Sequence, residues 1–284
     1  MKNVVIGMIL GIANVIPGVS AGTMAVVFKI YDQLLNSISL DIKKINFKFL
    51  ATIGIGVILG VLLFSNVITF LYENYNMQTN FVFIGVILGS IPMIYKKVSD
   101  AGPVNLSGIV IFVIPLVIML YMAIAGEGQG SEKVIENITI STGILLIIAG
   151  AVSAFTMIIP GISGSFILLT IGCYETIVKA ISDVSKLGVD FIKSDVSFVE
   201  IITFSGVHVL ILVAIGVFIG LIGGSKLVRM LLEDYPQATY LVILGLVVGS
   251  IFTIYPGFSL DATGIISIVC MIVALIVSYM FAEN

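Results

Sequence analysis

The sequence predicts an all-α polytopic membrane protein with an inverted-topology repeat, each half being a broken or re-entrant helical hairpin plus three transmembrane helices. Three observations lead to this fold class: a strongly apolar composition, a motif that occurs twice, and a constant spacing between matched residues. Hydrophobic residues make up 59% of the 284-residue chain and charged residues 10%, whereas a soluble domain carries about 25% charged residues. Several apolar runs also reach the ~20 residues that a helix needs to cross a bilayer.

Composition also argues against several classes of protein. The apolar runs show no ~10-residue alternating segments of the kind that a transmembrane β-barrel uses. The formal net charge of −3 argues against a nucleic-acid partner. Cys173 and Cys270 both lie in apolar runs, so we interpret them as small core residues rather than as a disulfide.

The N-terminal stretch has some features of a signal peptide. Lys2 precedes an apolar run that ends in Val19-Ser20-Ala21, which resembles a small-residue cleavage site. A related motif recurs in the middle of the chain, where no signal-peptidase substrate is expected. We therefore interpret this stretch as part of the fold.

A proline–glycine motif organises the chain. It reads PGVSAG at 17–22 and PGISGS at 160–165, and each copy interrupts apolar sequence. Proline and glycine are the strongest local breaks in a helix. Each copy therefore predicts a broken element inside the membrane. The paired runs are 3–16 and 20–38 around the first copy, and 138–159 and 165–181 around the second.

The two halves are internal repeats. An offset of 143 relates the two motifs and the residues just after them, and an offset of 160 relates the later segments, which indicates one insertion in the second half. We expect a single membrane domain over 1–284, with repeat one at 1–125 and repeat two at 138–284. The matched pairs include Pro17 with Pro160, Ser20 with Ser163, Tyr31 with Tyr174, Asp32 with Glu175, Gly56 with Gly216, Gly85 with Gly245, and Gly89 with Gly249.

Each broken element is followed by three plain apolar segments. A broken element makes either no net crossing or two crossings, so each half crosses the membrane an odd number of times. The second half must then lie upside down relative to the first. The predicted segments are 49–72, 80–95 and 106–124 in repeat one, and 200–222, 238–255 and 262–282 in repeat two.

The distribution of Lys and Arg predicts the orientation. Lysines gather in the loops at 39–48 and 96–105, and Lys226 and Arg229 lie in the loop at 223–237. The loop at 73–79 has no cation, and the loop at 182–199 has mixed charge. We therefore expect both termini on the cytoplasmic side.

The chemistry of the broken elements suggests an anion site. Inverted repeats with discontinuous helices are typical of secondary transporters, whose substrates bind at the breaks near the membrane midplane. The proline ends one arm, the glycine permits the turn, and the serine is a good N-cap for the next arm. Two helix N-termini would then present free N–H groups and positive dipole ends to a phosphate. The alternative is that these small residues only pack helices closely.

The residues that we expect at this site are substrate-binding residues and possible coupling or charge partners. Possible coupling or charge partners are ionisable groups in or near the apolar runs. We expect no catalytic residue, metal ligand or cofactor. The substrate-binding candidates are Asn14, Pro17, Gly18, Ser20, Gly22, Thr23, Pro160, Gly161, Ser163, Gly164 and Ser165, and the charge-partner candidates are Lys29, Asp32, Glu175, His208 and Arg229.

At these motifs the sequence resembles a known family. The stretches GIANVIPGVSAGTMAVVFKIYDQLL and MIIPGISGSFILLTIGCYETIVKAI are similar to those of the polyprenyl-phosphate transporter family PopT, formerly a domain of unknown function. The resemblance covers the whole chain, with Ala21 in place of an expected glycine. It implies a flippase that returns undecaprenyl phosphate from the outer to the inner leaflet of the cytoplasmic membrane, for the recycling of a carrier lipid in cell-wall biogenesis.

The residues alone leave other functions open. A transporter of a small soluble anion would use the same turns but would need a cavity closed to lipid. A membrane lipid phosphatase is disfavoured because the apolar runs hold one histidine and no paired acidic metal motif. The sequence does not specify a coupling ion, proton or sodium, and Gly216-x-x-x-Gly220 is compatible both with a homodimer and with packing inside the chain.

Overall fold

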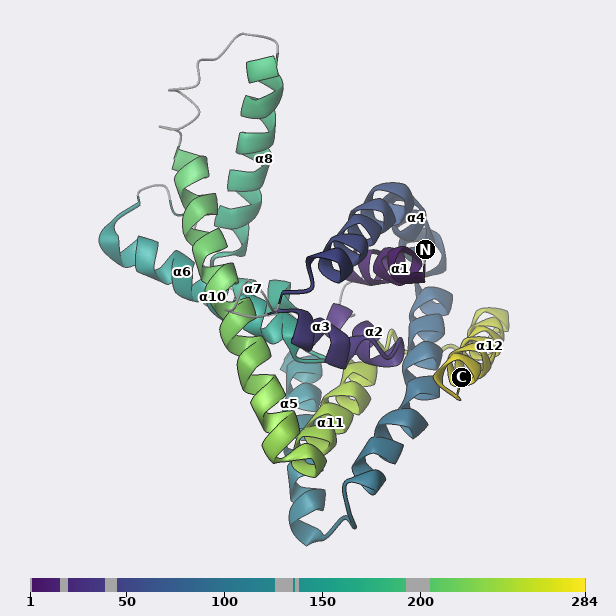
Figure 1. Ribbon diagram of the computed structural model, residues 1–284. Helices are drawn as coiled ribbons and strands as arrows, with labels where there is room; N and C mark the ends of the chain where they lie inside the picture. Colours follow the sequence, from purple (N-terminus) through teal and green to yellow (C-terminus); the bar gives the residue numbers. More distant parts are fainter. Residues whose placement is uncertain are drawn as a thin grey trace. The chain divides into compact units, whose positions relative to one another are not determined.

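The computed structural model describes residues 2–15, 20–38, 45–125, 135, 138–192 and 205–283 (Figure 1). These residues form α-helices joined by connections, and none of them lies in a strand. The helices are α1 (Lys2–Val15), α2 (Ala21–Val27), α3 (Tyr31–Ser37), α4 (Phe47–Asp100), α5 (Leu106–Ala125), α6 (Ile140–Ile158), α7 (Gly164–Ile171), α8 (Tyr174–Ile192), α10 (Ser205–Asp234), α11 (Pro236–Ile254) and α12 (Ala262–Glu283).

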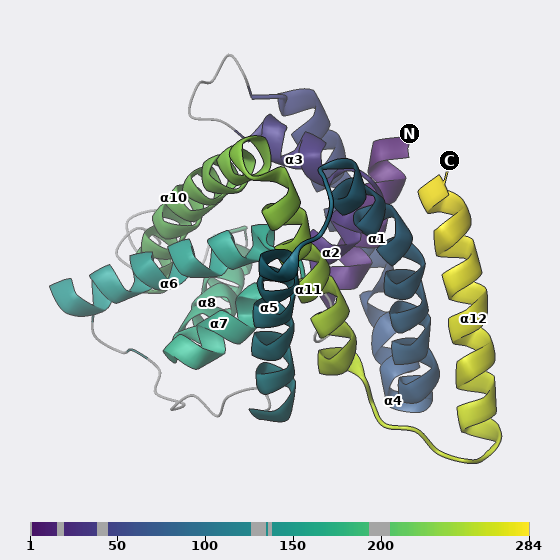
Figure 2. The same cartoon turned by 90° about the horizontal axis from the view of Figure 1, so that it is seen from below.

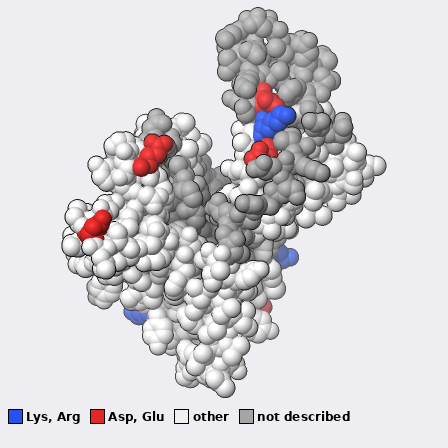
Figure 3. All heavy atoms as spheres, turned by 180° about the vertical axis from the view of Figure 1, so that it is seen from behind, with Lys and Arg blue, Asp and Glu red and all other residues white. Residues whose placement is uncertain are grey.

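Seven helical segments in the described part of the chain are long and apolar enough to cross a membrane. The broad surface between the few charged side chains in Figure 3 carries neither acid nor base, as expected of a surface that meets lipid. The prediction of an all-α polytopic membrane protein is therefore confirmed. The segments are Phe47–Phe64, Phe70–Asp100, Leu106–Ile124, Ile140–Ile158, Gly206–Asp234, Pro236–Ile254 and Ala262–Met280.

The chain folds into two compact units that do not follow the two repeats. Unit 1 comprises residues 1–125, 157–162 and 225–284, and unit 2 comprises 126–156 and 163–224. The second proline–glycine turn, at 160–161, therefore packs with the first half of the chain. The helices on either side of that turn belong mostly to unit 2.

Glycines set the helix packing of unit 1. Gly7 and Gly11 of α1 lie against the backbone of α4, and a Cβ at either glycine would meet carbonyl oxygens of Ile53 or Val57. Close backbone approach of this kind is how membrane helices gain contact area. Figures 1 and 2 show α1 beside the first part of α4.

The last helix of each repeat packs on the other repeat. Helix α12 packs against Gly85 and Gly89 in the second part of α4. The hydroxyl of Ser278 in α12 donates a hydrogen bond to the Val86 carbonyl at 2.7 Å. Helix α5 packs against the matched Gly245 and Gly249 of α11. The two views agree that α12 runs along α4 and that α5 runs along α11 (Figure 2). These contacts link the two repeats within unit 1.

Unit 2 repeats the glycine packing on its own. Gly216 and Gly220 of α10 lie against backbone atoms of Ile147 and Ala151 in α6. These glycines are the positions matched to Gly56 and Gly60, which lie against α1 in unit 1. The Gly216-x-x-x-Gly220 face is thus used inside the chain. Unit 2 also has a small hydrophobic core, which consists of Leu146, Ala149, Cys173, Ile177, Ala180 and Val209.

Two predicted loops, at 73–79 and 223–237, are instead single-residue breaks between helical segments. Tyr75 has φ −138° and ψ 42° within α4, and Tyr235 has φ −135° and ψ 57° between α10 and α11. At each break a threonine hydroxyl, from Thr79 or Thr239, donates to the tyrosine carbonyl at 2.8 Å. The prediction of loops was wrong because a break of one residue is enough to separate the helical segments, and the threonines satisfy carbonyls that the break exposes.

Other boundaries also differ from the prediction. The apolar runs at 20–38 and 165–181 are each divided again, between α2 and α3 and between α7 and α8. The polar stretch expected at 182–199 is helical as far as Ile192. Amphipathic helix is compatible with polar sequence, so charge alone gave the wrong boundary there.

Candidate functional site

The second proline–glycine turn is buried and directly contacts the start of α2. Pro160 is fully buried, and Gly161 has φ +90°, a conformation that favours glycine. A Cβ at Gly161 would lie 2.7 Å from the Leu246 carbonyl oxygen. The Gly161 N–H donates to the hydroxyl of Thr23 at 2.8 Å, across 138 positions of sequence. The turn is thereby fixed to a side chain that follows the first motif.

Gly22 extends the same contact. A Cβ at Gly22 would lie 3.0–3.3 Å from the carbonyl oxygens of Met157, Ile158 and Ile159. The space beside Gly22, which we expected a ligand to use, is therefore taken by the backbone at the end of α6. Gly22, Thr23, Pro160 and Gly161 are brought together by the structure.

The two motif serines occupy N-cap positions, as predicted, but their side chains do not cap. Ser20 precedes α2 and Ser163 precedes α7, both with extended backbone, and neither side chain accepts a hydrogen bond from its helix. The Ser20 hydroxyl is buried and has no hydrogen-bond partner among the described residues. The Ser163 hydroxyl pairs with that of Ser165 at 2.7 Å. The first N–H groups of a helix lack intrahelical acceptors, so these donors are left for another partner.

Gly164 contributes its backbone to unit 2. Its carbonyl accepts a hydrogen bond from the buried Ser153 hydroxyl at 3.0 Å, which ties the start of α7 to α6. This contact orders the N-terminal turn of α7 next to Ser163. Ser165 itself is exposed.

The remaining predicted residues lie elsewhere or outside the described part. Pro17 and Gly18 lie outside the described residues, and the Asn14 side chain is likewise not described. Glu175 is exposed in the first turn of α8, and His208 is exposed on α10. Arg229 is half-buried on α10 in unit 1.

Asp32 belongs to a cluster that sequence reasoning missed. Its carboxylate pairs with Lys97 Nζ at 2.6 Å, and the same ammonium donates to the Tyr240 hydroxyl at 3.1 Å. Lys29, the charge-partner candidate nearest to Asp32 in sequence, does not form this ion pair. Lys97 lies 65 positions away, at the end of α4, where its charge is equally well explained by membrane orientation.

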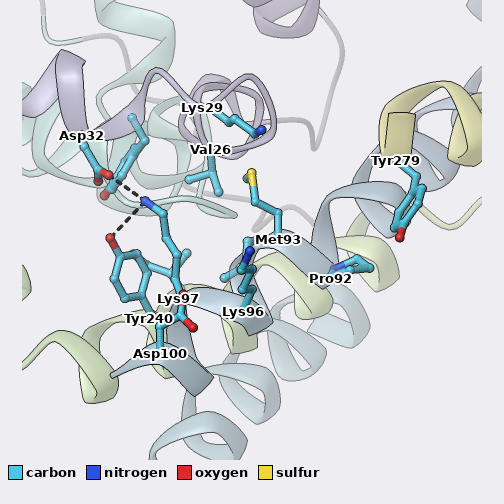
Figure 4. A pocket seen from close by; sticks show the side chains of 13 residues that line it. Val26, Lys29, Asp32, Pro92, Met93, Lys96, Lys97, Asp100, Tyr240 and Tyr279 are labelled. Atoms are coloured by element: carbon cyan, nitrogen blue, oxygen red, sulfur yellow. Dashed lines mark hydrogen bonds and ion pairs between the residues drawn. The ribbon is translucent and has the colours of Figure 1, made fainter. Parts of the chain in front are cut away.

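A cavity of about 460 Å³ surrounds this cluster in unit 1 (Figure 4). Three lysines line it, Lys29 from the α2–α3 connection and Lys96 and Lys97 from α4, together with Asp32 and Asp100. The lining therefore carries one net positive charge in a chain whose net charge is −3. Such a cavity can hold an anion.

Metal ligands do not gather in the described part of the chain. No group of three or more His, Cys, Asp or Glu side chains there is arranged to hold a metal ion. The two cysteines are free thiols rather than a disulfide, as predicted.

Comparison with known proteins gives a consistent result. A family model described as undecaprenyl phosphate translocase-like matches residues 10–269, which include both proline–glycine motifs. A protein of Staphylococcus aureus (strain NCTC 8325 / PS 47) named polyprenyl-phosphate transporter is 32% identical over 282 residues, covering 97% of this chain and 94% of that protein. A protein of Vibrio cholerae serotype O1 (strain ATCC 39315 / El Tor Inaba N16961) with the same name is 29% identical over 266 residues, covering 88% and 76%. No solved structure matches.

Proposed function

We propose, from the premise that this chain belongs to the undecaprenyl phosphate translocase-like family, that it transports polyprenyl phosphate across the cytoplasmic membrane. The substrate is undecaprenyl phosphate, and the direction is from the outer to the inner leaflet. The protein works as a flippase in carrier-lipid recycling and leaves its substrate chemically unchanged. The observation that carries this proposal is the family match, since it spans both motifs, six apolar helical segments and the start of the seventh.

The phosphate binds where the first and second motifs meet. Support comes from the start of α2, where Thr23 receives the Gly161 N–H and Ser20 keeps a buried hydroxyl with no described partner. A buried polar group without a partner costs about 1–3 kcal/mol. A phosphate oxygen would satisfy that hydroxyl together with the first N–H groups of α2.

The lipid tail stays in the bilayer while the headgroup crosses. A phosphate monoester carries between one and two negative charges near neutral pH, which makes unassisted crossing of the apolar bilayer core costly. Backbone donors at the two turns would replace the water that hydrates the phosphate. An alternating opening of the site to each leaflet would then move the headgroup without exposing it to lipid.

The two repeats have inverted topology in this proposal. The repeated break at Tyr75 and Tyr235 supports a common ancestry of the halves. The inversion rests on the odd number of crossings that the sequence predicts for each half. Both termini lie on the cytoplasmic side because lysines gather in the loops that this orientation places inside. A proton or sodium gradient drives net movement.

Reconstitution tests the proposal. The purified chain is placed in liposomes with labelled undecaprenyl phosphate in one leaflet, and loss of label from that leaflet is followed with and without a pH or sodium gradient. We expect protein-dependent movement that accelerates under one of the gradients. Movement equal to that in empty liposomes under all conditions would exclude lipid transport. Uptake of inorganic phosphate in place of the lipid would identify a soluble-anion transporter.

A further inference from the structure

The lysine-lined cavity of unit 1 carries an inference that deepens the proposed function and rests on it. We propose that this cavity binds the phosphate monoester of the substrate at a second site, separate from the proline–glycine turns, on the side where α4 ends. Its cations are Lys29, Lys96 and Lys97 (Figure 4). A phosphate monoester matches these groups because it has three acceptor oxygens and near neutral pH carries between one and two negative charges.

The backbone at Lys29 supports a role for its side chain. Lys29 has φ +59°, and it follows α2 in a turn where Ile30 N–H donates to the Ala25 carbonyl and Lys29 N–H donates to the Val26 carbonyl. This is the usual ending of a helix on a glycine. Any residue with a Cβ is strained in this left-handed conformation.

The second repeat uses glycine at the matched position. Gly172, 143 positions after Lys29, has φ +78°, and the two turn hydrogen bonds recur there from Cys173 and Gly172 N–H. The same turn is thus built once with glycine and once with lysine. A strained residue that persists where glycine would relieve the strain points to a functional constraint. Lys29 lines the cavity, so binding an anion there would be that constraint.

Two further groups in the cavity lining suit a phosphate: the ammonium group of Lys97 and the hydroxyl of Tyr31. Lys97 is fixed by Asp32 at 2.6 Å and by Tyr240 at 3.1 Å, which orients its ammonium group. The Tyr31 hydroxyl is buried and has no hydrogen-bond partner among the described residues, although Tyr31 lines the same cavity. A phosphate oxygen would accept from it.

The three lysines of the cavity all come from repeat one. At an offset of 160, the positions matched to Lys96 and Lys97 are Pro256 and Gly257, which carry no charge. The cationic cavity therefore has no counterpart built from the matched residues of the second repeat. In the predicted orientation α4 ends on the cytoplasmic side, so this cavity would hold the headgroup after it has crossed.

The test uses the double variant Lys29→Gln/Lys96→Gln, which removes two cations and leaves the Lys97–Asp32 ion pair intact. The matched control is Lys48→Gln, since Lys48 is an exposed lysine at the start of α4 that does not line the cavity. Binding is measured by titrating inorganic phosphate, and separately undecaprenyl phosphate, into each protein in zwitterionic nanodiscs. We expect about tenfold or greater loss of affinity in the double variant for both ligands, which corresponds to 1.4 kcal/mol, and no loss in the control.

Two further variants separate binding from folding. Lys29→Arg keeps the charge and should retain most of the affinity. Lys29→Gly should raise the melting temperature, because glycine relieves the left-handed strain, and should still weaken phosphate binding. If Lys29 had only a structural role, Lys29→Gly would raise the melting temperature without weakening phosphate binding.

The outcomes distinguish this inference from the proposed function. If the unaltered protein moves the lipid but the double variant binds both ligands with unchanged affinity, the cavity proposal is wrong and the transport proposal stands. If the protein does not move the lipid but inorganic phosphate binds in a lysine-dependent way, the cavity is a phosphate site and lipid transport is wrong. Loss of lipid affinity without loss of phosphate affinity would contradict a site for the phosphate group.

Discussion

Thr23→Val is the sharpest test of the contact between the two broken elements. Valine has nearly the shape of threonine but cannot accept the hydrogen bond from the Gly161 N–H, which in the structure is 2.8 Å long and buried. The N–H would then be buried without a partner, which costs about 1–3 kcal/mol. At about 2–4 °C per kcal/mol for a chain of this order of size, the melting temperature should fall by several degrees.

The assay is thermal unfolding in detergent micelles, followed by circular dichroism, with Thr23→Ser as the matched control. Serine keeps the hydroxyl, so it should lose only the small contribution of the methyl group. The reasoning would be refuted if the valine variant melted within about 1 °C of the serine variant. In that case the turn at 160–161 would not depend on Thr23.

Two other predictions concern backbone and charge. Gly161→Ala should destabilise the protein by more than about 1–2 kcal/mol, since alanine is strained at φ +90° and its Cβ would lie 2.7 Å from the Leu246 oxygen; a melting temperature equal to that of Gly223→Ala, a site with open space, would contradict this. Hydrogen bonds from the Ser259 hydroxyl and the Gly264 N–H hold the pKa of Asp261 below its usual value. Its stabilising effect should therefore be present above the unfolded pKa of about 3.9 and be lost as pH falls through the lower folded pKa. A stability difference between the protein and Asp261→Asn that persisted unchanged at the lowest pH would contradict it.

The sequence was most informative where structure depends on local chemistry. Apolar runs of sufficient length predicted the membrane helices, and proline with glycine predicted the break that the structure shows at 160–161. The N-cap positions of Ser20 and Ser163 followed from the same local rules. These features depend on residues within a few positions of one another.

The sequence was least informative where structure depends on distant contacts. The one-residue break at Tyr75 has no glycine or proline beside it, so no strong local signal marks it, whereas Pro236 directly follows the matched break at Tyr235. Asp32 and Lys97 lie on separate helices, so their ion pair has no local sequence signal. Membrane orientation was a sufficient explanation for a lysine at position 97. The left-handed turn at Lys29 could have been found from the repeat, because Gly172 occupies the matched position.

The most direct test of a phosphate site at the turns is the single variant Ser20→Ala. The Ser20 hydroxyl is buried without a partner among the described residues, so its removal should leave the melting temperature unchanged or raise it slightly. In the liposome assay the same variant should move undecaprenyl phosphate about tenfold more slowly, as expected for the loss of one hydrogen bond to a charged group. Unchanged transport with an unchanged melting temperature would show that the hydroxyl does not contact the substrate and would contradict a phosphate site at these turns.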